Sequence, residues 1–286
     1  MLASGGARVA GVMGWPVRHS LSPRLHGFWF ERHGIDGLYV PLPVRPEDLA
    51  DAFRVLPRLG LSGWNVTLPH KEAALRLVDE RDAAALRMGA VNTVLVLEDG
   101  RTRGLNTDGY GFLANLEEGA PGWREQAGAA VLVGTGGATR AVAWALHGAG
   151  RRQLRLVNRT PARAETLARE LAAAGAEVEV MAWEERAAAL EGACLLVNGT
   201  SLGMSGQPAL DLPLEALPRQ AVVSDLVYVP LETDLLRRAR ERGNRTVDGL
   251  GMLLHQAVPG FTHWGGTVPV VDRGLRACLL ETLAAR

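Results

Sequence analysis

The sequence predicts an α/β protein with two domains. Its 286 residues exceed what one hydrophobic core usually serves, so a division is expected. Strand-like apolar runs alternate with helical patterns along almost the whole chain, which is typical of βαβ units with parallel strands. A glycine-rich turn at 134–138 follows one of the most apolar of these runs.

The individual elements follow from hydrophobic periodicity and from Gly and Pro punctuation. In the first half we predict strands at 7–14, 38–44 and 63–68, helices at 23–34, 46–60 and 71–78, and a hairpin that starts with the run 90–100. A stretch rich in Gly, Pro and charge at 117–128 predicts a domain boundary. Beyond it, strands are predicted at 129–134, 154–159, 177–181, 194–200, 221–228 and 244–249, and the end of the chain is helical by pattern.

Composition narrows the classes of partner. Lys and Arg equal Asp and Glu at 31 each, so no general attraction to nucleic acid or to an anionic membrane is expected, and an anion must be bound locally. No signal peptide and no run of eighteen apolar residues is visible, so a cytoplasmic protein is expected. Cys194 and Cys278 lie in apolar surroundings without metal-ligand spacing, which predicts free, buried thiols.

The glycine-rich turn indicates nucleotide binding. Gly134, Gly136, Gly137 and Ala138 lie between an apolar strand and an alanine-rich helix. Glycines let the backbone approach a pyrophosphate, whose charge then lies at the helix N-terminus. A Gly-x-Gly-Gly sequence alone could be a tight loop, but this context favours a Rossmann-type dinucleotide-binding domain.

The strand after this helix indicates which nucleotide is bound. An NAD site usually ends that strand with Asp or Glu, which binds the ribose hydroxyls. Here Asn158, Arg159 and Thr160 end it, and Arg163 follows one turn later. Because arginine binds phosphate in bidentate geometry, this favours NADP. Weaker candidates for cofactor contacts, at later strand ends, are Asn198, Thr200, Leu226 and Gly249.

Polar residues also gather at the ends of strands in the first half of the chain. These residues are Ser20, Ser22, Asn65, Thr67, Lys71, Asn92, Thr93, Asn106 and Asp108. Each could have a structural role alone, such as capping a helix. Together they predict a site for a small ligand rich in hydroxyls, since Ser, Asn and Thr both donate and accept hydrogen bonds.

Oxidation of a secondary alcohol requires a group that takes the hydroxyl proton. Lys71 and Asp108 are the candidate pair. A neighbouring carboxylate raises the pKa of a lysine whereas burial lowers it, and sequence does not decide between the two effects. Lys71 as the base and Lys71 as an electrostatic stabiliser both stay open.

At this point the motifs resemble those of the shikimate dehydrogenase family over nearly the whole chain. The matching segments are GWPVRHSLSP, NVTLPHKE, GAVNTV, GLNTDGYG, GTGGATR, NRTPARA, NGTSLGM, DLVYVPLET and DGLGMLLHQA. The resemblance implies NADPH-linked reduction of 3-dehydroshikimate to shikimate in aromatic amino-acid biosynthesis. It also implies a substrate domain at 1–107, a Rossmann domain at 108–246, C-terminal helices at 247–286 that return to the first domain, and an active site in the cleft between the domains.

The resemblance assigns roles residue by residue. Ser20 and Ser22 match the serines that hold the substrate carboxylate, near which Tyr228 is also expected. The groups around the substrate hydroxyls are matched by Asn65, Thr67, Asn92 and Gln256. Lys71 and Asp108 match the catalytic pair, and the glycine-rich turn and the Asn158–Arg163 segment match the pyrophosphate and 2′-phosphate sites. One departure, His70, stands where an aromatic residue is frequent, and we expect it to cap a helix.

Other functions are open at this stage. A quinate/shikimate dehydrogenase that uses NAD would need few side-chain changes, although the missing acid counts against NAD. A non-catalytic binding protein on this fold would tolerate loss of Lys71 or Asp108, and both are present. A methylene-tetrahydrofolate dehydrogenase-like enzyme would need a more apolar pocket. The expected partners are small molecules only, in a monomer or a homodimer.

Overall fold

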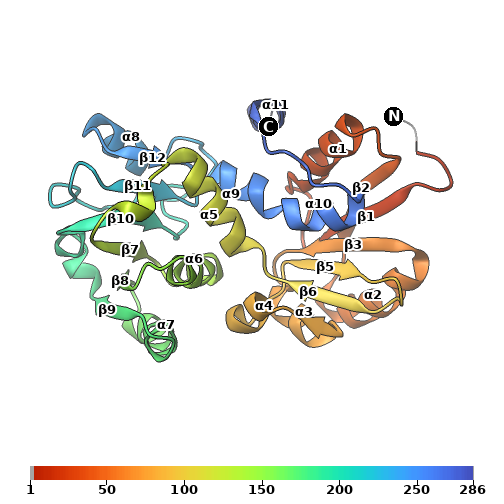
Figure 1. Cartoon of the computed structure of the whole chain (residues 1–286), viewed down its shortest axis with the longest axis horizontal. Helices are drawn as coiled ribbons and strands as arrows, with labels where there is room; N and C mark the ends of the chain where they lie inside the picture. Colours follow the sequence, from red (N-terminus) through yellow and green to blue (C-terminus); the bar gives the residue numbers. More distant parts are fainter. Residues whose placement is uncertain (1–2, 286) are drawn as a thin grey trace. The chain divides into compact units, whose positions relative to one another are not determined.

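The computed structural model describes residues 3–285. Contacts divide the chain into two compact units (Figure 1). Unit 1 consists of the residues up to Thr107 together with those from Gln256 onward, and unit 2 consists of Asp108–His255. The stretch 117–128 lies wholly inside unit 2, so its change in composition does not mark the division.

Unit 1 contains a six-stranded sheet in the order β2-β1-β3-β5-β6-β4. Its strands are β1 (Arg8–Gly14), β2 (Gly37–Pro43), β3 (Leu61–Val66), β4 (Glu80–Arg81), β5 (Thr93–Val96) and β6 (Thr102–Leu105). β1 is parallel to β2 and β3, as predicted, whereas β5 is antiparallel to β3 and β6. The hairpin is confirmed, and a short connection allows only antiparallel pairing there. The antiparallel pairing of β5 with β3 departs from the predicted parallel units, whereas β4 and β6 are again parallel.

Helices cover both faces of this sheet. They are α1 (Ser22–Arg32), α2 (Leu49–Val55), α3 (Lys71–Leu77), α4 (Ala83–Met88), α10 (Val258–Gly265) and α11 (Arg273–Ala284). The predicted helix 46–60 is instead three pieces, because α2 is flanked by 3-10 turns at Pro46–Asp48 and Leu56–Leu59. Pro57 lacks the N–H that an α-helical hydrogen bond would need there.

Successive residues of β3 serve opposite faces of the sheet, as the pleat requires. Trp64 is fully buried and packs edge-on against Phe53 of α2, with ring centroids 5.2 Å apart. Its neighbour Asn65 points to the opposite face, where its side chain accepts a hydrogen bond from Tyr39 and the centroid of the Tyr39 ring lies 5.8 Å from that of Trp264 of α10. The helices α1 and α10 lie over this side of the sheet (Figure 1). On that side a Cβ at Gly63 would lie 2.2 Å from Trp264 Nε1, so only glycine lets α10 lie this close.

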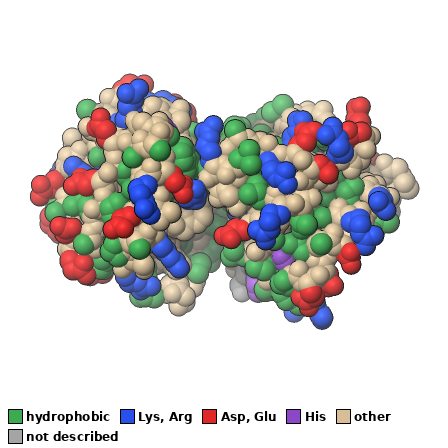
Figure 2. Space-filling view, turned by 90° about the horizontal axis from the view of Figure 1, so that it is seen from below, with side chains coloured by type: hydrophobic (Ala, Val, Ile, Leu, Met, Phe, Trp, Pro, Cys, Tyr) green, Lys and Arg blue, Asp and Glu red, His purple; other side chains and the backbone are tan. Residues whose placement is uncertain are grey.

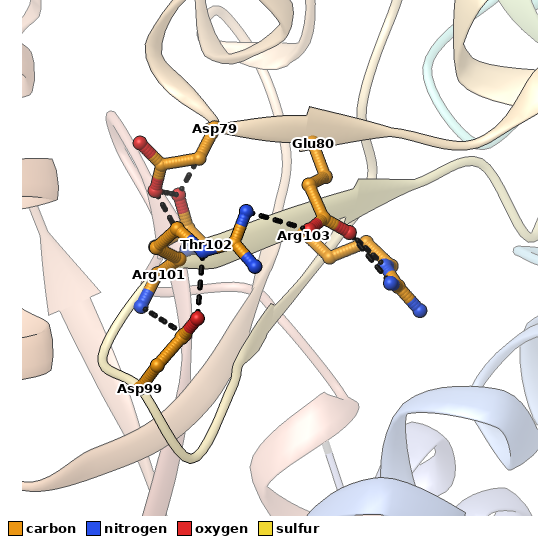
Figure 3. A network of polar contacts seen from close by, with 6 residues as sticks. All are labelled: Asp79, Glu80, Asp99, Arg101, Thr102 and Arg103. Carbon is orange, nitrogen blue, oxygen red and sulfur yellow. Dashed lines mark hydrogen bonds and ion pairs between the residues drawn. The ribbon is translucent and has the colours of Figure 1, made fainter.

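An ionic network holds the β4 edge of the sheet (Figure 3). The Asp79 carboxylate accepts hydrogen bonds from the N–H and the hydroxyl of Thr102, at 2.7 and 2.8 Å. Glu80 pairs with Arg101 at 2.9 Å and with Arg103 at 2.5 Å. Hydrogen bonds from Thr102 lower the pKa of the Asp79 carboxyl, so it stays ionised and ties β6 to the start of β4.

Unit 2 contains a fully parallel sheet in the order β12-β11-β10-β7-β8-β9. The strands are β7 (Ala129–Val133), β8 (Gln153–Val157), β9 (Glu177–Met181), β10 (Ala193–Asn198), β11 (Val222–Asp225) and β12 (Arg245–Val247). The strand order reverses between β7 and β10, where ligands of a Rossmann-type sheet bind. This confirms the predicted fold class.

The helices of unit 2 enclose its sheet. They are α5 (Asp108–Gly119), α6 (Gly137–Gly148), α7 (Pro161–Ala173), α8 (Asp234–Glu241) and α9 (Gly249–Gln256). One core lies between the sheet and α5, α6 and α7, and a second lies between the opposite face, the 210–217 segment and α8. The inward strand residues are apolar almost without interruption, as a sheet covered on both faces requires.

The surface charges agree with what the composition predicts, but one of the two cysteines does not. Basic and acidic side chains are interspersed on the face shown in Figure 2. No helix among residues 3–285 is long and apolar enough to cross a membrane. Both cysteines are free thiols, and Cys194 is buried as predicted, but Cys278 is only partly buried because it lies on the terminal helix α11.

Candidate functional site

The glycine-rich turn leaves β7 at the point where the strand order reverses. Gly134 has φ +92°, and a Cβ there would lie 2.8 Å from Thr200 Cγ2. Glycine is therefore needed for both the left-handed backbone and the close approach. Two predicted cofactor residues, Gly134 and Thr200, are brought together here. The contact is reinforced by Thr139, which the sequence reasoning missed and whose hydroxyl donates to Gly199 O at 3.2 Å.

The N-terminus of α6 provides room and charge for an anion. Gly136 is its N-cap and Gly137 its first residue, both exposed, and a Cβ on either would meet nothing within 4 Å. The first turn carries no acidic residue. Its N–H groups and the helix dipole attract negative charge. The turn thus has the room and the charge that a pyrophosphate needs, and the assignment of Gly134 to Ala138 to that group stays a prediction.

The end of β8 fits an additional phosphate. Asn158 donates to Thr160 O at 2.7 Å, which shapes the turn before α7. Arg159 and Arg163 are exposed, and the ion pairs of the described residues give neither an acidic partner. Because no carboxylate neutralises this pair of guanidinium groups, the residues present suit NADP rather than NAD.

Two buried polar residues organise the loops after β10 and β11. Asn198 donates to Asp225 Oδ1 at 2.9 Å and to Leu202 O at 3.0 Å, and its oxygen accepts from the N–H and hydroxyl of Thr200. Asp225 also accepts from Val227 N at 3.0 Å and Thr233 Oγ1 at 2.7 Å. Asn198 is fully buried with its hydrogen-bonding groups used. The suggestion that Asn198 lines the cofactor is therefore wrong, and Asn198 instead fixes the loop of Thr200.

Asp225 is a titratable group inside this network. Its exposed fraction is 0%. Burial raises the pKa of its carboxyl to about 6, against hydrogen bonds from Thr233, Val227 and Asn198 that lower it. Sequence reasoning did not single out Asp225, although an acid at the end of the buried strand β11 was a visible signal. The loop it holds also carries Leu226, whose carbonyl oxygen would lie 2.3 Å from a Cβ at Gly249.

Unit 1 brings several of the predicted substrate residues into one network. Asn65 Nδ2 donates to Asn92 O at 3.2 Å and to Thr93 Oγ1 at 3.0 Å. Asn92 Nδ2 donates to Thr107 Oγ1 at 3.0 Å, and its oxygen accepts from Thr107 N at 2.9 Å. All four residues are buried, so these amides and hydroxyls are held in fixed orientations.

The remaining predicted residues of unit 1 lie at or next to the ends of helices and strands. Ser20 Oγ accepts from Ser22 N at 3.2 Å at the start of α1. Thr67 follows β3 and donates its N–H to Met13 O at 2.8 Å. Lys71 begins α3, and its carbonyl accepts from Val91 N at 2.9 Å, which joins it to the residue before Asn92. Gln256 ends α9.

One prediction for this loop is wrong. His70 occupies the N-cap position of α3, but its side chain makes no capping hydrogen bond. It is buried, and its Nε2 lies 2.8 Å from Val44 O. The imidazole therefore joins the loop after β3 to the loop after β2 and does not cap the helix.

Asp108 begins α5 in unit 2, and Tyr228 lies on the loop after β11. α5 is fixed against α9 by a close contact, because a Cβ at Gly251 would lie 1.8 Å from Asn115 Oδ1. Asn115 Nδ2 also donates to Asp248 O at 2.7 Å, beside the predicted cofactor residue Gly249. The helix that carries Asp108 is thus anchored to the segment that carries Gly249.

The chain resembles known proteins over nearly its whole length. Residues 12–94 match the family described as "Shikimate dehydrogenase substrate binding domain", and residues 123–203 match "Shikimate / quinate 5-dehydrogenase". A "Shikimate dehydrogenase (NADP(+))" of Paramagnetospirillum magneticum is 59% identical over 278 residues, covering 97% of this chain and 100% of that protein.

Solved structures agree. The shikimate 5-dehydrogenase of Thermus thermophilus in complex with NADP(H) and shikimate has a TM-score of 0.84 at 39% identity, covering 96% of this chain and 99% of that one. The quinate dehydrogenase of Corynebacterium glutamicum in complex with NAD has a TM-score of 0.89 at 34% identity, with coverage of 96% and 99%.

The fold and the site define a two-unit α/β protein whose second unit is a dinucleotide-binding domain. The matches to both units, with 59% identity to a full-length relative, identify its family. The chain belongs to the shikimate dehydrogenase family.

Proposed function

We propose that this protein is an NADP-dependent shikimate dehydrogenase, which interconverts 3-dehydroshikimate and shikimate in aromatic amino-acid biosynthesis. One observation carries the assignment of the chemistry. Of the 31 basic residues, 30 are arginine and one is lysine, and that lysine is Lys71. Arginine stays protonated in proteins, whereas the pKa of a lysine can be lowered into the working range. The backbone of Lys71 is joined to Val91, the residue before Asn92, which supports the proposal that this single amine serves the proton transfer.

In the proposed reaction Lys71 Nζ takes the hydroxyl proton of shikimate during oxidation and returns it to the carbonyl oxygen during reduction. Asp108 acts with it as the second member of the acid–base pair. Ser20, Ser22 and Tyr228 bind the carboxylate, and the hydroxyls are bound by Asn65, Thr67, Asn92 and Gln256. When bound, the nicotinamide supplies the hydride acceptor of the oxidation and the hydride donor of the reduction.

The cofactor is proposed to bind to unit 2 through three segments. Gly134, Gly136, Gly137 and Ala138 hold the pyrophosphate, and Asn158, Arg159, Thr160 and Arg163 hold the adenosine 2′-phosphate. Thr200, Leu226 and Gly249 line the path toward the nicotinamide. The open backbone at Gly136 and Gly137 and the unneutralised arginines support this assignment.

The activity is tested by mixing the purified protein with shikimate or quinate and with NADP+ or NAD+, and following absorbance of the reduced nicotinamide. Reduction with shikimate and NADP+ alone is the expected result. Turnover of quinate or use of NAD+ would move the protein to the quinate/shikimate dehydrogenases. These two mixtures are included because the fold resembles that of the Corynebacterium glutamicum quinate dehydrogenase in complex with NAD. Absence of reduction in all four mixtures would contradict an enzymatic function.

Replacing both arginines of the proposed 2′-phosphate site is expected to change cofactor preference. In the double variant Arg159→Ser, Arg163→Ser, the KM for NADP+ should rise about 100-fold, since each lost charged hydrogen bond weakens binding by roughly 1.5 kcal/mol. The KM for NAD+, which lacks this phosphate, should change little. Arg169→Ser, an exposed arginine further along α7, is the matched control. Equal losses for NADP+ and NAD+ would rule out the assignment of a 2′-phosphate site.

A further inference from the structure

Tyr39 of β2 contacts two predicted substrate residues but has no role in the assignments above. It is 7% exposed, and its hydroxyl donates to Asn65 Oδ1 at 2.5 Å. Burial raises the pKa of the phenol well above its ordinary value, against hydrogen bonds to Asn65 and Ser22 that lower it. The phenol is therefore a neutral donor that touches both Ser22, at the proposed carboxylate end, and Asn65, at the hydroxyl end.

The contact with Tyr39 determines what Asn65 can offer to a ligand. Both amide hydrogens of Asn65 are directed at protein acceptors, Asn92 O and Thr93 Oγ1. A flipped amide would turn its oxygen toward the Asn92 carbonyl, where two acceptors would face each other. Oδ1 has two lone pairs, and Tyr39 uses one of them. The His26 side chain also interacts with Asn65, so a substrate hydroxyl that donates to Oδ1 would share or replace that second contact.

The ring of Tyr39 is itself held in place by aromatic packing. His26 stacks on it with ring centroids 4.1 Å apart and an interplanar angle of 12°. Trp264 of α10 lies on the same side, with its centroid 5.8 Å from that of Tyr39. Burial lowers the pKa of His26 to about 3, so the stacked ring is neutral and the packing is unaffected by pH in the ordinary assay range.

We infer that Tyr39 is a positioning residue of the substrate site. Its hydroxyl orients the Asn65 carboxamide so that Oδ1 accepts a hydrogen bond from a substrate hydroxyl, and it couples this group to Ser22. The inference rests on the proposed function, because the ligand whose hydroxyl Asn65 would accept is shikimate.

The test is Tyr39→Phe, which removes the hydroxyl and keeps the ring. The KM for shikimate should rise about tenfold, the size of one hydrogen bond, while kcat and the KM for NADP+ stay within about twofold. In an Asn65→Ala background the same change should add almost nothing, since the partner is already gone. Tyr110→Phe, on a half-exposed tyrosine of α5, is the matched control.

A second measurement separates positioning from a general loss of structure. For the shikimate analogue that lacks the hydroxyl bound by Asn65, the KM should be the same in wild type and Tyr39→Phe. For the analogue that lacks the other non-reacting hydroxyl, the KM should still be about tenfold higher in Tyr39→Phe. An unchanged KM in an active Tyr39→Phe enzyme would overturn the inference, as would equal losses for all substrates together with a lowered melting temperature. A wild-type protein inactive on shikimate would instead contradict the proposed function.

Discussion

Replacement of Lys71 by Ala is expected to reduce kcat about 10³-fold, the usual size of a general acid–base contribution. The KM for shikimate should change little, because Asn65 and Asn92 are held by hydrogen bonds to backbone groups and to Thr93 and Thr107. Steady-state kinetics of shikimate oxidation by NADP+ measure both values. Near-normal turnover would remove Lys71 from the mechanism.

Replacement of Lys71 by Arg distinguishes proton transfer from electrostatic stabilisation. Arginine keeps the positive charge but does not release its proton, so this variant should be about as slow as Lys71→Ala if Lys71 is the acid–base group. Recovery of much of the activity would assign it a purely electrostatic role. Since the chain has one lysine, reductive methylation with carbon-13, which keeps the charge, places one side-chain NMR probe at Lys71 and measures its pKa directly.

Asp225 is expected to make the folded protein less stable as pH rises from about 4 to about 7. Its pKa is raised from 3.8 to about 6 in the native state, so between these values the native state retains a proton that the unfolded chain has released. The free energy of unfolding therefore falls with increasing pH across this window, by about 3 kcal/mol for a shift of this size.

Urea unfolding of wild type and Asp225→Asn at pH 4, 5, 6 and 7 measures this effect. The stability of wild type relative to Asp225→Asn should decline by about 2 kcal/mol from pH 4 to pH 7, because the amide does not titrate. Asp48→Asn, on an exposed carboxylate, should show no such trend. A difference independent of pH would mean that Asn198, Val227 and Thr233 keep Asp225 ionised throughout.

The sequence was informative where one local feature determines the structure. The run Ala129–Val133 with Gly134 after it predicted both a buried parallel strand and the turn at the reversal of strand order, because each follows from side-chain size and backbone freedom. The missing acid after Val157 was also visible, because the residue that follows a predicted strand is read directly from the sequence.

Features that depend on partners distant in the sequence were not predictable in this way. The role of Tyr39 depends on Asn65, which the pairing of β2, β1 and β3 brings to the same face of the sheet. It also depends on His26 of α1, which stacks on the Tyr39 ring. His70 resembled a helix cap because its position in the chain is that of a cap, but its side chain bonds to Val44, 26 residues earlier. The antiparallel pairing of β5 with β3 was not predicted, because a short apolar run does not encode which strand it joins or in which direction.

The two-segment composition of unit 1 affects the order in which the chain can fold during synthesis. Asp108–His255 is contiguous, so every residue of unit 2 is synthesised before the second segment of unit 1. The face of the unit 1 sheet that carries Tyr39 and Asn65 is closed by Phe261 and Trp264 of α10, which belong to the second segment of unit 1. Until α10 has been synthesised this face lacks its aromatic cover, so the proposed substrate site is completed only after the whole of unit 2 has been translated.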